Sequence, residues 1–316
     1  MGCTSDSDFF GIWGSSEDVF VVGGGVSNYS QRGAVIFHNN GTEWKSEALN
    51  VLQAFSFSIR AVGGSSSNDV YFAGEGKAIR HYDGSGPLGG QFASVEGGWD
   101  DVSAASPEAV FLVDRYYGDI CRADGIWGGT EWHLGDWVLS VWAISATKAI
   151  VVGSGGRIDH LDGNEWVSMT SGTTSQLIDA WASSASDVFA VGQAGTICHY
   201  DGSTWSVMPT ETSNSLQAVW GNSDHDVFAV GDAGTILHYD GSSWHDLESP
   251  TDEHLTGVWS SSPADVFAVG RSILLHYDGT SWTRMKGAPG GTRVWGSSPG
   301  DVYLIDDGAR IFHYGS

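Results

Sequence analysis

The sequence predicts an all-β fold, a single eight-bladed β-propeller with about 39 residues and four antiparallel strands in each blade. Three observations predict it. A repeat of that length runs through the 316-residue chain, a complete copy holds four strand-like segments, and glycine and tryptophan are spread along the whole chain. The 45 glycines beside 7 prolines suit many tight turns, and the 41% of hydrophobic residues supply a core. We expect residues 1–8 to form an N-terminal tail and residues 9–316 to form the propeller.

The repeat is clearest in residues 218–244, AVWGNSDHDVFAVGDAGTILHYDGSSW. The position of Trp220 recurs in eight copies, which are separated by 50, 40, 39, 39, 39, 39 and 36 residues. The residues at this position are Trp13, Gly63, Ser103, Trp142, Trp181, Trp220, Trp259 and Trp295. Two copies have therefore lost the tryptophan.

Each copy divides into four strands in a fixed order. The first ends at VWG, the second is DVFAVG, the third is TILHYDG, and the fourth opens with tryptophan. The second strand carries four consecutive apolar residues, which indicates burial on both faces between stacked sheets. The last copy stops one strand short, and the segment from Cys3 to Asp8 is a candidate to complete it.

The formal net charge of −24 disfavours nucleic acid and anionic membranes as ligands, because both are polyanions. No apolar run approaches the roughly 18 residues of a membrane helix, so we expect no transmembrane segment. No signal peptide is evident in the sequence. We expect no required cofactor, since no loop has the ligand spacing of a calcium site.

Histidine and aspartate each recur at one position of the repeat. His38, His81, His160, His199, His238, His276 and His313 share one position, with Arg122 in the remaining copy. Asp18, Asp69, Asp187, Asp226, Asp265 and Asp301 precede the second strand. Equivalent residues in different blades cannot converge on one metal ion unless they line the axis, so we expect each histidine to hydrogen-bond within its blade. We expect the aspartates to accept backbone N–H groups at a turn.

The sequence contains no nucleophile elbow, no HExxH and no phosphate-binding glycine loop. Serine, histidine and aspartate are so frequent that no particular catalytic triad stands out. We therefore expect no catalytic residues and no enzyme activity. A hydrolase or lyase with a site on the propeller axis ranks third among the functions considered.

Cys121 and Cys198 share one repeat position in the third and fifth blades. Residues two blades apart cannot approach to the roughly 5.5 Å between Cα atoms that a disulfide requires, so we expect two thiols. Cys3 follows Gly2 in a polar segment and is a candidate lipidation site. A chance cysteine in a terminal segment is the alternative.

The run WGSSPxDVFAVGxxGTILHYDGxxW resembles a family of tryptophan- and glycine-rich propeller repeats found in bacterial exported proteins and lipoproteins. The resemblance covers nearly the whole chain and implies an exported protein of the periplasm, outer membrane or exterior, with a cytoplasmic location as the alternative. More distantly, HYDGSSW at residues 238–244 is similar to the Asp-box of sialidase-type propellers. Here the tryptophan follows the aspartate by four residues, one fewer than in the Asp-box.

Departures from the repeat indicate where function resides. The loop between the second and third strands is expanded in blade one, where it includes Tyr29 and Arg32. The corresponding loop of blade three and the connections on either side of that blade carry Arg115, Tyr116, Tyr117, Trp99 and Trp137. These loops emerge on one face of a propeller, so we expect a surface that binds a partner. The alternative is that the rings fill space where Gly63 and Ser103 replaced tryptophan.

These observations favour a non-catalytic binding or scaffold module that presents one face to a protein partner. The second candidate is a propeller lectin that binds a glycan through aromatic stacking between blades. We expect the protein to be monomeric and, if Cys3 is modified, to carry a lipid anchor.

Overall fold

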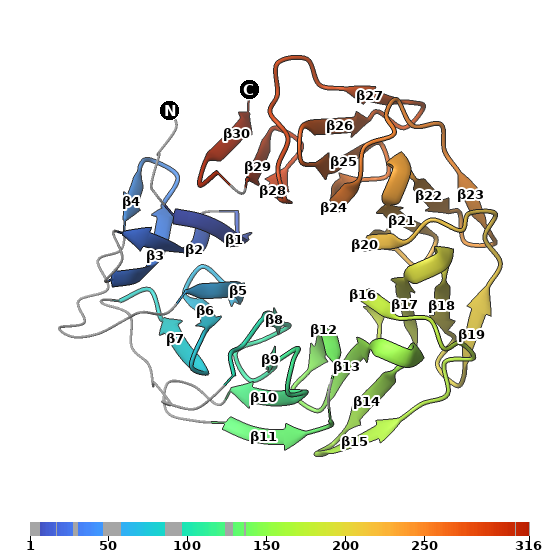
Figure 1. Ribbon diagram of the computed structural model, residues 1–316, viewed down its shortest axis with the longest axis horizontal. Helices are drawn as coiled ribbons and strands as arrows, with labels where there is room; N and C mark the ends of the chain where they lie inside the picture. Colours follow the sequence, from blue (N-terminus) through green and yellow to red (C-terminus); the bar gives the residue numbers. More distant parts are fainter. Residues whose placement is uncertain are drawn as a thin grey trace.

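The chain forms a closed ring of eight antiparallel sheets around a central axis (Figure 1), which confirms the predicted eight-bladed β-propeller. The structure is a computed structural model. It describes residues 7–16, 18–27, 31–46, 58–85, 97–123, 129–135, 137–306 and 308–315. Within each sheet, every strand pairs with its neighbour in sequence, so the sheet is a meander that runs outward from the axis.

The first four blades hold strands β1 to β15. Blade one contains β1 (Ser7–Gly14), β2 (Val19–Ser27), β3 (Gln31–Asn39) and β4 (Trp44–Ser46). Blade two contains β5 (Ile59–Ser66), β6 (Asp69–Gly74) and β7 (Ala78–Tyr82). Blade three contains β8 (Asp101–Ala104), β9 (Val110–Val113), β10 (Asp119–Ala123) and β11 (Gly129–His133). Blade four contains β12 (Val138–Ser145), β13 (Lys148–Gly153), the 3-10 turn η1 (Ser154–Gly156), β14 (Ile158–Asp162) and β15 (Glu165–Ser168).

The last four blades follow the repeat more closely. Blade five contains β16 (Leu177–Ser184), β17 (Asp187–Gly192), η2 (Gln193–Gly195), β18 (Ile197–Tyr200) and β19 (Trp205–Met208). Blade six contains β20 (Leu216–Ser223), β21 (Asp226–Gly231), η3 (Asp232–Gly234), β22 (Ile236–Tyr239) and β23 (Trp244–Asp246). Blade seven contains β24 (Leu255–Ser262), β25 (Asp265–Gly270), β26 (Ile273–Tyr277) and β27 (Trp282–Arg284). Blade eight contains β28 (Arg293–Ser298), β29 (Asp301–Ile305) and β30 (Ile311–Gly315).

The ring closes between blades eight and one through side-chain packing. Ser7 and Asp8, which the sequence offered as part of a strand for the last blade, pair with β2 in blade one. The rest of the candidate segment lies outside the described residues. Phe9 of β1 instead packs in one buried cluster with Tyr303 and Ile311 of blade eight. The apolar contact between blades therefore closes the ring without a shared sheet among the described residues.

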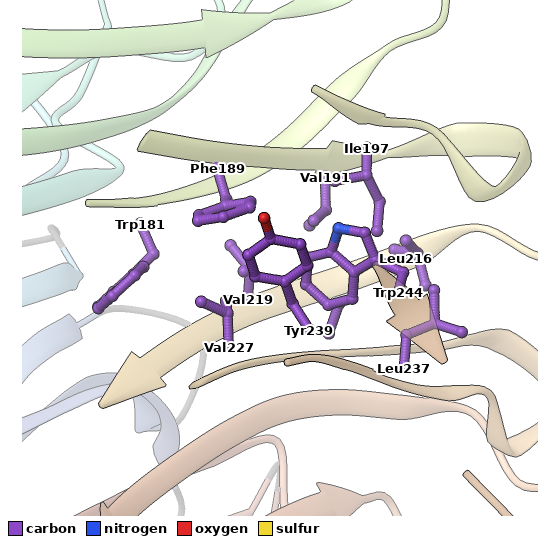
Figure 2. Packing of buried hydrophobic residues seen from close by; sticks show 11 residues of the cluster. Trp181, Phe189, Val191, Ile197, Leu216, Val219, Val227, Leu237, Tyr239 and Trp244 are labelled. Atoms are coloured by element: carbon purple, nitrogen blue, oxygen red, sulfur yellow. The ribbon is translucent and has the colours of Figure 1, made fainter. Parts of the chain in front are cut away.

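The core consists of apolar layers between successive blades (Figure 2). Trp181 and Phe189 of blade five face Tyr239 and Trp244 of blade six, and the Phe189 and Tyr239 rings lie 5.1 Å apart. Each second strand contributes side chains to the layers on both of its faces, which accounts for its unbroken run of apolar residues. This confirms the burial that the sequence predicted for DVFAVG.

Four tryptophans of the first strands wedge against the next blade, and each meets a glycine there. A Cβ built on Gly221 would lie 2.6 Å from the Trp181 ring. The equivalent pairs are Trp13 with Gly64, Trp259 with Gly296, and Trp295 with Gly14, the last of which spans the ring closure. Trp142 and Trp220 line the central channel instead, and the next blade has Ala182 or Ser260 at the glycine position. Glycine is therefore needed at these four positions because a side chain would overlap the tryptophan ring, and not because the backbone turns there.

Six of the seven histidines at the repeat position hydrogen-bond to an aspartate of the same blade, as predicted. In blade six, Nε2 of His238 lies 2.7 Å from Oδ1 of Asp226, and the imidazole stacks on Phe228 with ring centres 4.4 Å apart. The other pairs are His38 with Asp18, His81 with Asp69, His199 with Asp187, His276 with Asp265, and His313 with Asp301. The second carboxylate oxygen of five of these aspartates accepts from a serine or asparagine at 2.5 to 2.6 Å. Among the described residues, the donors to these carboxylates are thus side chains and not the expected backbone N–H groups, because the third strand places its histidine within reach.

Blade four is the exception, and its histidine bonds to the next blade. Lys148 occupies the aspartate position, so His160 has no carboxylate at the site that the other blades use. Burial, followed by the Lys148 ammonium, lowers the pKa of His160. The neutral imidazole accepts the indole N–H of Trp205 in blade five at 3.1 Å. The loss of one charge partner is compensated by a bond between blades.

Cys121 and Cys198 are both buried thiols, as predicted. The Sγ of Cys198 donates to the carbonyl of Ser171 at 3.7 Å, and burial raises the pKa of this thiol to about 11. A buried thiol with a raised pKa is a packing residue and not a nucleophile.

Candidate functional site

Tyr116, Tyr117 and Trp137 come together on the face formed by the loops of blades three and four. The Tyr116 ring lies 5.8 Å from that of Trp137 and 5.0 Å from that of Tyr117, both edge to face. Tyr116 is 62% exposed and Trp137 is 52% exposed, whereas Tyr117 is partly buried. We call these three residues the aromatic patch. An exposed aromatic pair of this kind offers a large apolar area at low cost in side-chain entropy.

The loop that carries Tyr116 and Tyr117 is held in place by one buried carboxylate. Asp114 is 1% exposed, and its Oδ1 accepts the backbone N–H groups of Tyr116 and Tyr117, each at 2.9 Å. Its Oδ2 accepts the N–H of Gly98 from the connection that enters blade three, also at 2.9 Å. The aromatic patch therefore rests on a preorganised loop, which lowers the entropy lost on binding.

Trp137 is held in a backbone conformation that tryptophan seldom adopts. Its φ of 69° lies in the left-handed region, which costs a non-glycine residue roughly 1–2 kcal/mol. The guanidinium of Arg157 fixes the preceding turn, since it donates to the carbonyls of Leu134 and Gly135 and to the carboxylate of Asp159. An exposed tryptophan on a strained, braced turn is typical of a functional position and not of space filling.

Trp99 and Arg115, the other residues predicted for this surface whose side chains the structure describes, do not join the patch. Trp99 is 1% exposed and packs with Tyr71 between blades two and three, so it belongs to the core there and not to the surface. Tyr29 and Cys3 lie outside the described residues, as does the side chain of Arg32. Arg115 points away from its neighbours in sequence and into the central channel.

Two connected polar cavities occupy the channel, with volumes of about 440 and 380 Å³. Arg115 and Arg293 line both of them, so the cavities meet at these two side chains. Trp142 and Trp220 lie in the wall of the larger cavity, edge to face with ring centres 6.2 Å apart. The channel thus combines charged groups with an aromatic surface in a volume typical of ligand pockets.

A β-bulge brings two side chains from each of several inner strands toward the channel. The register shifts at this point in β1, β5, β12, β16, β20 and β24. The residue two positions before the repeat-position tryptophan is small and uncharged in most blades, whereas blades three, five and eight have Asp101, Asp179 and Arg293 there. Of these three residues, Asp179 follows a bulge, and Asp101 and Arg293 begin strands that pair without a register shift at this point. The sequence analysis missed these three residues. A charge at a repeat position that otherwise holds glycine, alanine or serine was the available signal.

The two channel carboxylates also tie neighbouring blades together. Oδ2 of Asp101 accepts the N–H of Val141 in blade four at 3.2 Å, and Oδ2 of Asp179 accepts the N–H of Val219 in blade six at 3.0 Å. The hydroxyl of Ser140 lies between them, 3.1 Å from Asp101 and 3.4 Å from Asp179. Burial in the channel wall raises the pKa of Asp179 to about 6, and the Asp101 carboxylate adds to this shift.

We predict that Asp179 makes stability fall with rising pH. Its pKa in the folded protein lies above the unfolded value of about 4, so folding favours the protonated form. The free energy that protonated Asp179 contributes to folding is therefore present at pH 4 and is lost as the pH rises to about 6. Above that pH the contribution is absent. Relative to Asp179→Asn, the wild type should lose about 2 kcal/mol over this range, less than the full shift because the side chain is partly exposed. Urea unfolding at pH 4, 5, 6 and 7 measures this difference, and parallel profiles for both proteins would contradict it.

Within the part of the chain that the structure describes, no three histidine, cysteine, aspartate or glutamate side chains are grouped to hold a metal ion. No helix in the same residues is long and apolar enough to cross a membrane.

No family model matches the chain, and no curated protein sequence matches it. Solved structures of propellers do match over nearly the whole length. Sqt1 of Chaetomium thermophilum bound to the N-terminus of ribosomal protein L10 is 12% identical with a TM-score of 0.78, covering 98% of this chain and 97% of that one. YCF48 bound to D1 peptide is 15% identical with a TM-score of 0.62, covering 100% and 96%. The C-terminal WD40 domain of Sif2 is 11% identical with a TM-score of 0.75, covering 99% and 97%. At these identities the likeness shows the propeller fold alone.

Proposed function

We propose that this propeller is a non-catalytic module that binds a protein partner through the aromatic patch. The observation that carries the proposal is the contact between Tyr116 and Trp137, two rings that are more than half exposed and lie on braced loops. Aromatic residues on a preorganised surface are the side chains that most often dominate binding energy between proteins. Two structural neighbours, Sqt1 and YCF48, are recorded with a protein segment or a peptide bound, which is consistent with this use of the fold.

We also propose, from the sequence resemblance, that the protein acts at the bacterial cell envelope or exterior and is anchored through Cys3. The support is the likeness of its repeats to those of exported propellers and the polar residues that follow Cys3.

The test is capture of a partner from the envelope fraction of the native host. The wild type is compared with Tyr116→Ala/Trp137→Ala and with Val167→Ala/Val207→Ala, which removes two exposed side chains from outer strands β15 and β19. We expect one protein to be retained by the wild type and by the valine variant but not by the aromatic variant. With that protein purified, calorimetry should show binding weakened about thirtyfold or more.

Circular dichroism must first show that all three proteins are folded. Equal capture by the aromatic variant would remove the patch from the interface. Retention of glycan alone would replace protein binding with the lectin function.

A further inference from the structure

Arg115 and Arg293 face the channel, and neither forms an ion pair with a carboxylate of the described residues. The chain has 14 lysines and arginines and a net charge of −24, so cations are scarce. Arg60, which also lines the channel, forms ion pairs with Asp100 at 2.6 Å and with Glu75 at 3.1 Å. Arg293 instead donates only to the carbonyl of Thr292, at 3.4 Å, among the bonds of the described residues. The buried Nε of Arg115 has no acceptor within the same residues.

These two guanidiniums repel one another. Burial within the channel, together with the Arg115 charge, lowers the pKa of Arg293, while Asp101 and Asp179 oppose that shift. The Arg293 side chain still reaches water in the channel, although protein surrounds it. Two like charges and an unsatisfied donor lie where the two cavities meet. An anion that bridges the two guanidiniums would reduce their repulsion and accept the free N–H group.

We propose that the channel is a binding site for a monocarboxylate with an apolar body, held between Arg115 and Arg293. A carboxylate is planar and accepts paired N–H bonds from a guanidinium. Its single charge suits a site that Asp101 and Asp179 also face, because a phosphate dianion would meet stronger repulsion from them. Trp142 and Trp220 in the wall of the larger cavity offer a surface for the apolar part of the ligand.

A carboxylate with an apolar body could come from two sources, a small free acid or the carboxyl end of a peptide that enters the channel. This site is separate from the aromatic patch and does not depend on the proposed partner. The two can be tested apart, because the channel test uses defined small probes and leaves Tyr116 and Trp137 unchanged.

Calorimetric titration of the full chain tests the proposal. The probes are 3-phenylpropionate, its neutral amide, inorganic phosphate, and an N-acetylated tripeptide ending in phenylalanine with a free or an amidated carboxyl group. We expect the carboxylate of one source to bind and its amide not to bind. Arg115→Met and Arg293→Met should each weaken binding at least about tenfold, whereas Arg284→Met on the outer strand β27 should leave it unchanged.

If a variant is less stable than the wild type, thermal unfolding with and without the carboxylate still distinguishes binding from its absence. The bound carboxylate should raise the Tm of the wild type and of Arg284→Met, and should not raise that of either channel variant. Binding of the free acid identifies a small molecule as ligand, and binding of the peptide alone identifies a chain terminus. Equal binding of the amides, tighter binding of phosphate, or no binding of any probe would overturn the proposal.

Discussion

Trp181→Ala is expected to lower the free energy of unfolding by about 3–5 kcal/mol. The Trp181 ring is 6% exposed and belongs to the apolar layer between blades five and six, where it packs beside Phe189 and against Gly221 (Figure 2). Its removal leaves a cavity that the rigid sheets cannot close. Because each blade contacts only its neighbours, the cavity weakens one interface of the ring. Urea unfolding followed by circular dichroism measures the loss.

Trp142→Ala is the matched control, since Trp142 has the same repeat position but lines the channel. Its removal opens no sealed cavity, and we expect a loss of about 1–2 kcal/mol. Gly221→Ala should cost about 1–3 kcal/mol in the wild type, because its Cβ would overlap the Trp181 ring, and clearly less in Trp181→Ala. Equal losses for both tryptophan variants, or strictly additive effects in the double mutant, would show that the wedge is not the source of the stability.

Asp226→Ala is expected to destabilise the protein by about 2–4 kcal/mol. The substitution removes the acceptor of His238 at 2.7 Å and of the Asn222 amide at 2.6 Å, and the His238 ring stacks on the buried Phe228. Polar groups left without a partner in a partly buried site cost about 1–3 kcal/mol each, and more when charge is involved. The same urea titration measures the effect.

Asp224→Ala, two residues earlier, controls for the general loss of an acidic side chain. Asp224 is exposed and lies 3.6 Å from His225, which is also exposed, so we expect a change within about 0.5 kcal/mol. A loss at Asp226 no larger than at Asp224 would mean that the histidine–aspartate pairs do not stabilise the blades.

The aromatic patch was predictable because the repeat shows at which position of a blade each residue lies. Once the loops of blades three and four are known to emerge on one face, Tyr116, Tyr117 and Trp137 fall together, and the structure brings them within contact distance. Trp99 shared the same prediction yet is buried. Position along a repeat places a residue on a loop, but it does not say whether a neighbouring blade leaves a gap beneath that loop.

The channel site was not predicted. Arg115 was grouped with the tyrosines that follow it, but adjacent side chains in a tight loop diverge, and its guanidinium enters the channel. Asp101, Asp179 and Arg293 come from blades three, five and eight. Their proximity arises from ring closure, which arranges the inner strands of these blades around one channel, and in the case of Asp179 also from the bulge that precedes it.

The amino-acid sequence alone determined the all-β class, the eight blades, the strand order and the histidine positions, because these follow from a local pattern repeated along the chain. Only the tertiary structure decided which tryptophans wedge between blades, how the ring closes, and which charges meet on the axis. The physical reason is that local periodicity specifies how a strand pairs with its neighbour in sequence. Burial, pKa and charge pairing depend instead on side chains from distant blades that share one enclosed space.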